Sequence, residues 1–155
     1  MFCNVGFAND IEEFEIEGIS IGDSLLDHLS KEEIITEIEF NKPTYNYLNN
    51  DFGEVYLFGD FAIYKHLTFF VKPKDKHYTI HMIKGAILYD DKLEQCFAKQ
   101  KEIEKEFSSI YKNAKKRKMT LEFDWYPTGE SVTHNIYFDF DTGDYVRVGY
   151  ERKVS

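Results

Sequence analysis

Two serines lie in a short segment whose glycines could expose a nucleophile. Ser20 stands between Gly18 and Gly22, and Ser24 follows two positions after Gly22. Glycines permit the sharp turn that lifts a serine hydroxyl to the mouth of an active site. A serine hydroxyl is nevertheless a poor nucleophile unless a base takes its proton and a third group orients that base. The segment therefore indicates hydrolytic chemistry only if such partners exist.

Both serines belong to sequences that resemble hydrolase motifs. Gly22-Asp23-Ser24-Leu25 is similar to the signature of the GDSL hydrolases, and residues 18–22, Gly-Ile-Ser-Ile-Gly, resemble the nucleophile elbow of the α/β-hydrolases. The chain contains no Asp-x-x-His and no later Gly-x-Asn-Asp, and it lacks the alternating strand and helix units of those folds. We therefore predict that Ser24 caps a helix and that the chain has no catalytic residue. A GDSL-like serine hydrolase that uses Ser24 is the alternative.

Two motifs near the C-terminus indicate a turn. Asp141-Thr142-Gly143 resembles the active-site triplet of aspartic proteases, but no second triplet supplies the partner carboxylate. A calcium-loop pattern that begins at Asp139 fails because Tyr150 stands where a bidentate Glu is required. We predict a hairpin turn with its glycine in a left-handed conformation.

Three histidines are predicted to lie on two neighbouring strands. His77 and His81 share a strand face, and His66 lies on the adjacent strand. Four residues of strand separate two side chains by roughly 13 Å, which is too far for both to bind one metal ion. We expect no metal site and no cofactor. A histidine cluster completed by a third residue from the neighbouring strand is the alternative.

Length, composition and charge restrict the class of protein. The chain has 155 residues, of which 43% are hydrophobic and 17% aromatic, and a formal charge of -9. Residues 1–60 hold 14 acidic and 2 basic side chains, which gives net -12, and residues 61–155 hold 14 and 17, which gives net +3. This asymmetry argues against a nucleic-acid partner. No run approaches the roughly 18 apolar residues of a membrane span.

The first eight residues are typical of the end of a signal peptide. Gly6 and Ala8 occupy the small-residue positions of a cleavage site within Met1–Ala8. On this interpretation the protein is exported or periplasmic, and Cys96 remains as a lone thiol. The alternative is a short N-terminal arm of a cytoplasmic protein.

The remaining residues, 9–155, are expected to form a single α+β domain. The pattern predicts a strand over 14–17, two short helices up to Ile38, a hairpin over 61–82, a long helix over 93–114 and three further strands. Ser30 and Glu33 form a capping box that starts the second short helix. The basic segment Lys115–Lys118 is typical of a helix C-terminus. We predict an antiparallel sheet covered on one face by the long helix and the two short N-terminal helices, with Trp125 buried against the long helix.

The opposite face of this sheet is predicted to be polar but aromatic. Strand alternation assigns ten residues to it: Tyr64, His66, Thr68, His77, Thr79, His81, Tyr126, Tyr137, Tyr145 and Arg147. Such side chains also decorate ordinary strands. Tyr and Arg are enriched at binding hot spots, however. We therefore predict a binding site that contains Tyr64, His66, His81, Tyr137 and Arg147.

Three segments resemble a family of small, exported bacterial proteins with no known activity. They are residues 17–27 (EGISIGDSLLD), residues 96–101 (CFAKQK) and residues 137–146, with Tyr-Phe-x-Phe-x-x-Gly-Asp-Tyr-Val. The resemblance implies export and assigns no functional residue. Together with the missing catalytic partners, it predicts a noncatalytic binding protein of the bacterial cell envelope. The expected partner is a protein or a small polar ligand.

Overall fold

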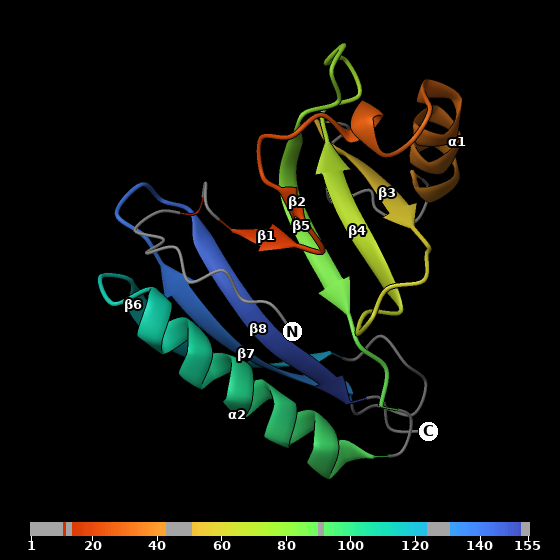
Figure 1. Ribbon diagram of the computed structural model, residues 1–155. Coiled ribbons are helices and arrows are strands. Elements are labelled where there is room, and N and C mark those ends of the chain that lie inside the picture. Colours follow the sequence, from red (N-terminus) through yellow and green to blue (C-terminus); the bar gives the residue numbers. More distant parts are fainter. Residues whose placement is uncertain (1–10, 12–13, 43–50, 90–91, 124–130, 153–155) are drawn as a thin grey trace. The chain divides into compact units, whose positions relative to one another are not determined.

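The computed structural model describes residue 11 and residues 14–42, 51–89, 92–123 and 131–152, and these form two compact units (Figure 1). The N-terminal unit lies within residues 12–88, and the C-terminal unit within residues 89–155 together with Ile11. The expectation that residues 9–155 behave as one domain stays a prediction. The expected cleavage site and the predicted burial of Trp125 lie outside the described residues.

The described part of the N-terminal unit contains two antiparallel sheets and two helical segments. In chain order its elements are β1 (Glu15–Ile16), β2 (Ile19–Ser20), the 3-10 helix η2 (Leu25–Asp27), α1 (Lys31–Asn41), β3 (Gly53–Leu57), β4 (His66–Val71) and β5 (Ile80–Ala86). β1 and β2 form a ribbon, and the other strands form a sheet in the order β3-β4-β5. Neighbours in this sheet are consecutive in the chain, because antiparallel strands need only short connections.

Serine caps begin both helical segments. Ser24 Oγ accepts a hydrogen bond of 3.3 Å from the backbone N–H of Leu26 at the start of η2. Ser30 and Glu33 form the predicted capping box at the start of α1. The first of the two expected short helices is only a three-residue 3-10 turn. It stays short because Ser24 pairs with Thr79 in a β-bridge and because Ser30 starts α1 soon after its end.

A β-bulge in β5 changes which of its side chains are buried. The register between β4 and β5 shifts after Ile80, so that Phe70 pairs with Met82 and His81 is an extra residue. An inserted residue reverses the alternation of side chains beyond it. Met82 is accordingly 44% exposed, whereas Ile83 is buried. The alternation that assigned His77, Thr79 and His81 to one face of this strand is therefore wrong beyond Ile80.

The core of the N-terminal unit lies between one face of the β3-β4-β5 sheet and the helical segments. Its fully buried apolar side chains are Leu25, Ile34, Val55, Leu67, Phe69, Val71 and Ile80. Leu67, Phe69 and Val71 alternate along β4 and form the contribution of this strand to the core. Gly53 permits α1 to lie close to β3, since a Cβ at this position would come within 2.6 Å of the Ile38 side chain.

The C-terminal unit packs one helix against a second three-stranded antiparallel sheet. Its elements are α2 (Leu93–Ile110), β6 (Lys115–Phe123), β7 (Ser131–Asp139) and β8 (Tyr145–Arg152), and the strand order is β6-β7-β8. Figure 1 shows α2 along one face of this sheet. The ring of Phe107 contacts Phe138 edge-on with centroids 5.8 Å apart, and Phe97 contacts Tyr150 in the same way at 4.5 Å. These aromatic contacts join the helix to the sheet.

The basic segment Lys115–Lys118 begins β6 and is not the end of a helix, because α2 ends at Ile110. Within a strand, alternate side chains point to opposite faces. Lys116 and Lys118 point toward α2, where their Nζ atoms lie 3.2 and 2.9 Å from Glu104 Oε1. The prediction that this segment stabilises a helix C-terminus is therefore wrong. Lys116 and Lys118 contact α2 instead, whereas Arg117 pairs with Asp139 on the other face of the sheet.

The predicted α+β class with antiparallel sheets is confirmed, although the layout differs in detail. The described strands form three sheets and not one. α1 packs on the sheet of the N-terminal unit and α2 on that of the C-terminal unit. Among the described residues, no helix combines the length and the apolar character that crossing a membrane requires.

Candidate binding face

The five residues predicted to bind a partner divide between the two units. Tyr64, His66 and His81 belong to the N-terminal unit, and Tyr137 and Arg147 to the C-terminal unit. Tyr64 packs against the apolar core and not on the polar face to which alternation assigned it, because β4 begins only at His66. His81 is the inserted residue of the bulge. The structure thus brings together Tyr137 and Arg147, which pair directly across β7 and β8.

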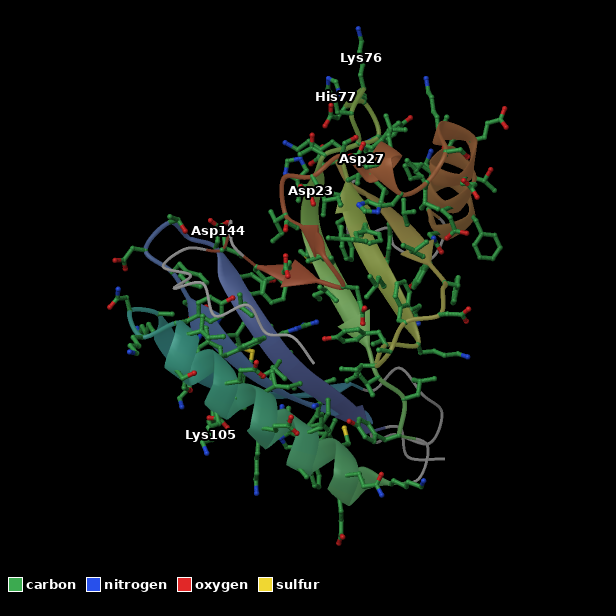
Figure 2. All side chains as sticks on the ribbon, viewed as in Figure 1. Asp23, Asp27, Lys76, His77, Lys105 and Asp144 are labelled. Atoms are coloured by element: carbon green, nitrogen blue, oxygen red, sulfur yellow. The ribbon has the colours of Figure 1, made fainter. Side chains whose placement is uncertain are left out.

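Other members of the predicted polar face are also separated. Thr68 is fully buried. His77 lies at the tip of the turn between β4 and β5 (Figure 2). Tyr145 contacts the ring of Tyr137 edge-on, with centroids 5.5 Å apart. Tyr126 lies outside the described residues.

The candidate site lies on the face of the β6-β7-β8 sheet that points away from α2. Phe138 contacts α2, so its neighbours Tyr137 and Asp139 point to the other side. The register assigns six residues to two adjacent rows of this face: Arg117, Tyr137 and Arg147 in one, and Lys115, Asp139 and Tyr145 in the other. We call these six residues the Arg-Tyr face.

A bidentate ion pair organises one side of this face. Arg117 Nε donates to Asp139 Oδ2 at 2.9 Å, and a terminal nitrogen of Arg117 donates to Asp139 Oδ1 at 3.0 Å. Hydrogen bonding by Arg117, reinforced by its charge and that of Lys115, lowers the pKa of Asp139 below its usual 3.8. The guanidinium carbon of Arg117 also lies 4.1 Å from the centre of the Tyr137 ring. Arg117 is therefore held between a carboxylate and an aromatic ring.

The rest of the face is accessible. Tyr145 is 45% exposed and Arg147 is exposed, and the next positions of β6 add Met119 and Leu121, which are 37% and 38% exposed. Asn135, the cross-strand partner of Met119 on β7, is buried. The face therefore offers aromatic, apolar and cationic groups to a partner, in a combination suited to recognition.

Three residues of this face, Lys115, Arg117 and Asp139, were not predicted from the sequence. Lys115 and Arg117 were assigned to a helix end, and Asp139 was considered only as part of a calcium loop. A usable signal did exist in the alternation of Lys115, Arg117, Met119 and Leu121. Read as a strand of period two, this pattern predicts one basic and apolar face next to that of Tyr137.

A second polar cluster lies in the N-terminal unit, on the sheet face opposite to its core. Glu54 and Thr68 are buried there, and Glu54 Oε2 and Thr68 Oγ1 have no hydrogen-bond partner among the described residues. Burial raises the pKa of Glu54, while a hydrogen bond with Tyr56 and the charge of Lys84 act to lower it. Unpaired buried groups of this kind destabilise a fold.

An aromatic group borders this cluster. The rings of Tyr56, Phe58 and His66 lie 5.3 to 6.1 Å apart, centre to centre. Burial, together with the charges of Lys84 and Lys65, lowers the pKa of His66 below its usual 6.5. The imidazole of His66 is therefore neutral at neutral pH.

Ser24, the nucleophile of the alternative hydrolase, is engaged by the main chain. Its Oγ donates a hydrogen bond of 2.7 Å to the backbone carbonyl of His77 and accepts one from the N–H of Leu26. Asp23 of the same motif accepts a hydrogen bond from the N–H of Ser20 at 2.8 Å. Both side chains of the motif thus stabilise the loop that leads into η2.

The remaining motifs have structural roles. Within the described part of the chain, no three His, Cys, Asp or Glu side chains gather as they would around a metal ion. Asp141-Thr142-Gly143 forms the predicted turn between β7 and β8, with Gly143 at a φ of 92°. Thr142 Oγ1 donates to Asp144 at 2.9 Å within this turn.

Comparison of the chain with protein-family models, with curated proteins and with solved structures finds no match. Functional inference therefore depends on the arrangement of the residues described above.

Proposed function

We propose that this chain is a noncatalytic binding protein of the bacterial cell envelope, and that the Arg-Tyr face recognises its partner, a protein or a small polar molecule. The observation that supports this most is the set of contacts around Tyr137. Arg117 covers its ring, Tyr145 contacts its edge, and Arg147 is its direct cross-strand neighbour. A rigid aromatic group with flanking cations is a common anchor at protein interfaces.

Preorganisation is the physical reason why such a face would bind. Ordering a long side chain on binding costs about 0.5–1.5 kcal/mol. Arg117 is already ordered by Asp139, and Tyr137 by its neighbours, so a partner would not have to supply this ordering. The exposed Tyr145, Met119 and Leu121 add apolar area at the same face.

The proposed location in the cell envelope rests on the expected cleavage site at Gly6 and Ala8 and on the family resemblance, which implies export. The hydrolase alternative has less support, because the hydroxyl proton of Ser24 is donated to a backbone carbonyl. A backbone carbonyl does not act as the general base that a nucleophilic serine requires.

Partner capture with surface variants tests the proposal. Immobilised protein is incubated with an extract of the organism that makes it, and the retained molecules are identified by mass spectrometry. Tyr145→Ala is expected to remove the specific partner. Phe40→Ala, which removes an aromatic side chain that is 78% exposed on α1, is the matched control and is expected to retain it. Retention by Tyr145→Ala together with loss by Phe40→Ala would contradict the proposal.

A further inference from the structure

The two arginines of the Arg-Tyr face stand on either side of Tyr137 but differ in their partners. The register pairs Tyr137 with Arg117 on β6 and with Arg147 on β8. Both oxygens of Asp139 are used by Arg117. None of the described residues forms an ion pair with Arg147, which is exposed. One of two equivalent positions beside Tyr137 thus lacks a carboxylate.

The charge around Arg147 is also unbalanced. The two rows of the face contain Lys115, Arg117 and Arg147 against one carboxylate, Asp139. On the other face of the sheet, Lys116 and Lys118 both contact the carboxylate of Glu104. The exposed acids Asp141 and Asp144 lie in the hairpin turn between β7 and β8. Figure 2 shows Asp144 at this turn. On the Arg-Tyr face, the three cations of the two rows outnumber the one carboxylate, so an excess of positive charge stands there.

We propose that Arg147 binds a carboxylate of the partner, and that the partner is a protein that presents an acidic segment to this face. This inference rests on the proposed function. The contact between Arg117 and Asp139 provides the geometric template, because a guanidinium fits a carboxylate through two parallel hydrogen bonds. Tyr145, beside Arg147 in the adjacent row, contacts the apolar atoms next to the bound carboxylate.

A nucleic-acid partner fits these charges less well. A phosphate could also pair with Arg147. However, the chain carries a formal charge of -9, and residues 1–60 alone carry net -12. This field repels a long polyanion, whereas a short acidic segment requires only local compensation.

Titration with defined peptides tests the inference on the full chain. The probe is an oligoglutamate peptide, with an oligoglutamine peptide of equal length and an oligothymidylate as controls, and binding is followed by NMR at low ionic strength. Oligoglutamate is expected to shift the amide signals of β7 and β8 and to bind more tightly than both controls. Equal binding of oligoglutamine, or tighter binding of oligothymidylate, would overturn the inference.

Charge-matched variants locate the contact. Arg147→Gln is expected to weaken oligoglutamate binding about tenfold, the size of a lost charge-assisted hydrogen-bonded pair. Lys105→Gln removes the same charge from the outer side of α2 (Figure 2) and is expected to leave the affinity within about twofold of the wild type. Equal weakening by both variants would overturn the inference, because it would reveal a nonspecific charge effect.

Two further outcomes distinguish the carboxylate contact from the proposed function and a partner protein from a second copy of the chain. If oligoglutamate fails to bind but Tyr145→Ala still removes the captured partner, the carboxylate contact is wrong and the proposed function stands. If sedimentation shows a dimer of the wild type that Arg147→Gln dissociates, the acidic segment belongs to a second copy of this chain. That result would overturn the assignment of a separate partner protein.

Discussion

Arg117 donates two hydrogen bonds to Asp139, 2.9 and 3.0 Å long, while its guanidinium covers the ring of Tyr137. The carboxylate of Asp139 therefore positions the guanidinium of Arg117, which in turn contacts the ring of Tyr137. We predict that Asp139→Asn leaves the fold intact but shifts and broadens the ring signals of Tyr137 in NMR spectra. Asp144→Asn, in the hairpin turn, removes the same charge and is expected to leave these signals unchanged. Unchanged Tyr137 signals in Asp139→Asn would contradict this account of the face.

The same contact predicts a pH dependence. Because Arg117 lowers the pKa of Asp139 below 3.8, the ion pair contributes stability at pH values above the usual aspartate range. This contribution is lost as the pH falls through the lowered pKa. The change in the Tyr137 ring signals is therefore expected to have its midpoint below 3.8, the usual value for aspartate. A change centred above pH 5 would be inconsistent with the ion pair.

Thr68 is fully buried, and its hydroxyl has no partner among the described residues. Replacing it with a valine of similar shape removes the cost of an unsatisfied polar group. We predict that Thr68→Val raises the free energy of unfolding by about 1 kcal/mol in urea denaturation. Thr79→Val is the control and should lower it, because the Thr79 side chain hydrogen-bonds Asp75. Destabilisation by Thr68→Val would indicate that its hydroxyl has a partner.

Glu54 is expected to destabilise the fold when ionised, since burial raises its pKa above the usual 4.5. The folded state then binds a proton more tightly than the unfolded state. The stability of the wild type relative to Glu54→Gln should therefore increase as the pH falls from neutral toward 4.5. The comparison is made by urea denaturation across this pH range.

Glu33→Gln provides a control of opposite sign. Hydrogen bonds from Ser30 lower the pKa of Glu33, so its contribution is present above 4.5 and is lost as the pH falls below that value. The difference in the free energy of unfolding between the wild type and Glu33→Gln should therefore shrink as the pH falls below 4.5. If both glutamate variants showed the same pH trend, the raised pKa of Glu54 would be wrong.

Ser24 is predicted to act as a structural cap. Ser24→Ala removes the hydrogen bonds to the carbonyl of His77 and from the N–H of Leu26. We expect it to lower the free energy of unfolding by about 0.5–2 kcal/mol, the usual cost of a lost N-cap. The wild type should not react with a fluorophosphonate probe. Covalent labelling at Ser24 would restore the hydrolase alternative.

Local signals in the sequence predicted some elements well, whereas tertiary effects decided others. The capping box of Ser30 and Glu33 was predictable because the two residues contact each other within one helical turn. The bulge at His81 was not, because an inserted residue depends on the register with β4. A run of lysines favours a helix end and an edge strand equally. The alternation that continues through Met119 and Leu121 distinguishes the strand, and the pairing of β6 with β7 establishes it.

The candidate site was predictable only in part for the same reason. Tyr137 and Arg147 follow from the alternation of two adjacent strands joined by a short turn. Arg117 comes from β6, so its contact with Tyr137 depends on strand pairing across a longer connection. The five predicted residues lie in two units because the chain forms two separately packed units. Strand alternation carries no information about that division.

The most direct measurement of the central claim is site-specific photo-crosslinking in the cells that make the protein. A photoreactive phenylalanine analogue replaces Tyr145 on the Arg-Tyr face or, as the control, Lys105 on the outer side of α2 (Figure 2). Our account predicts a crosslinked product of defined mass at position 145 that is absent at position 105 and disappears with the added change Arg147→Gln. Crosslinks of equal yield at both positions, or none at position 145, would contradict a recognition role for this face.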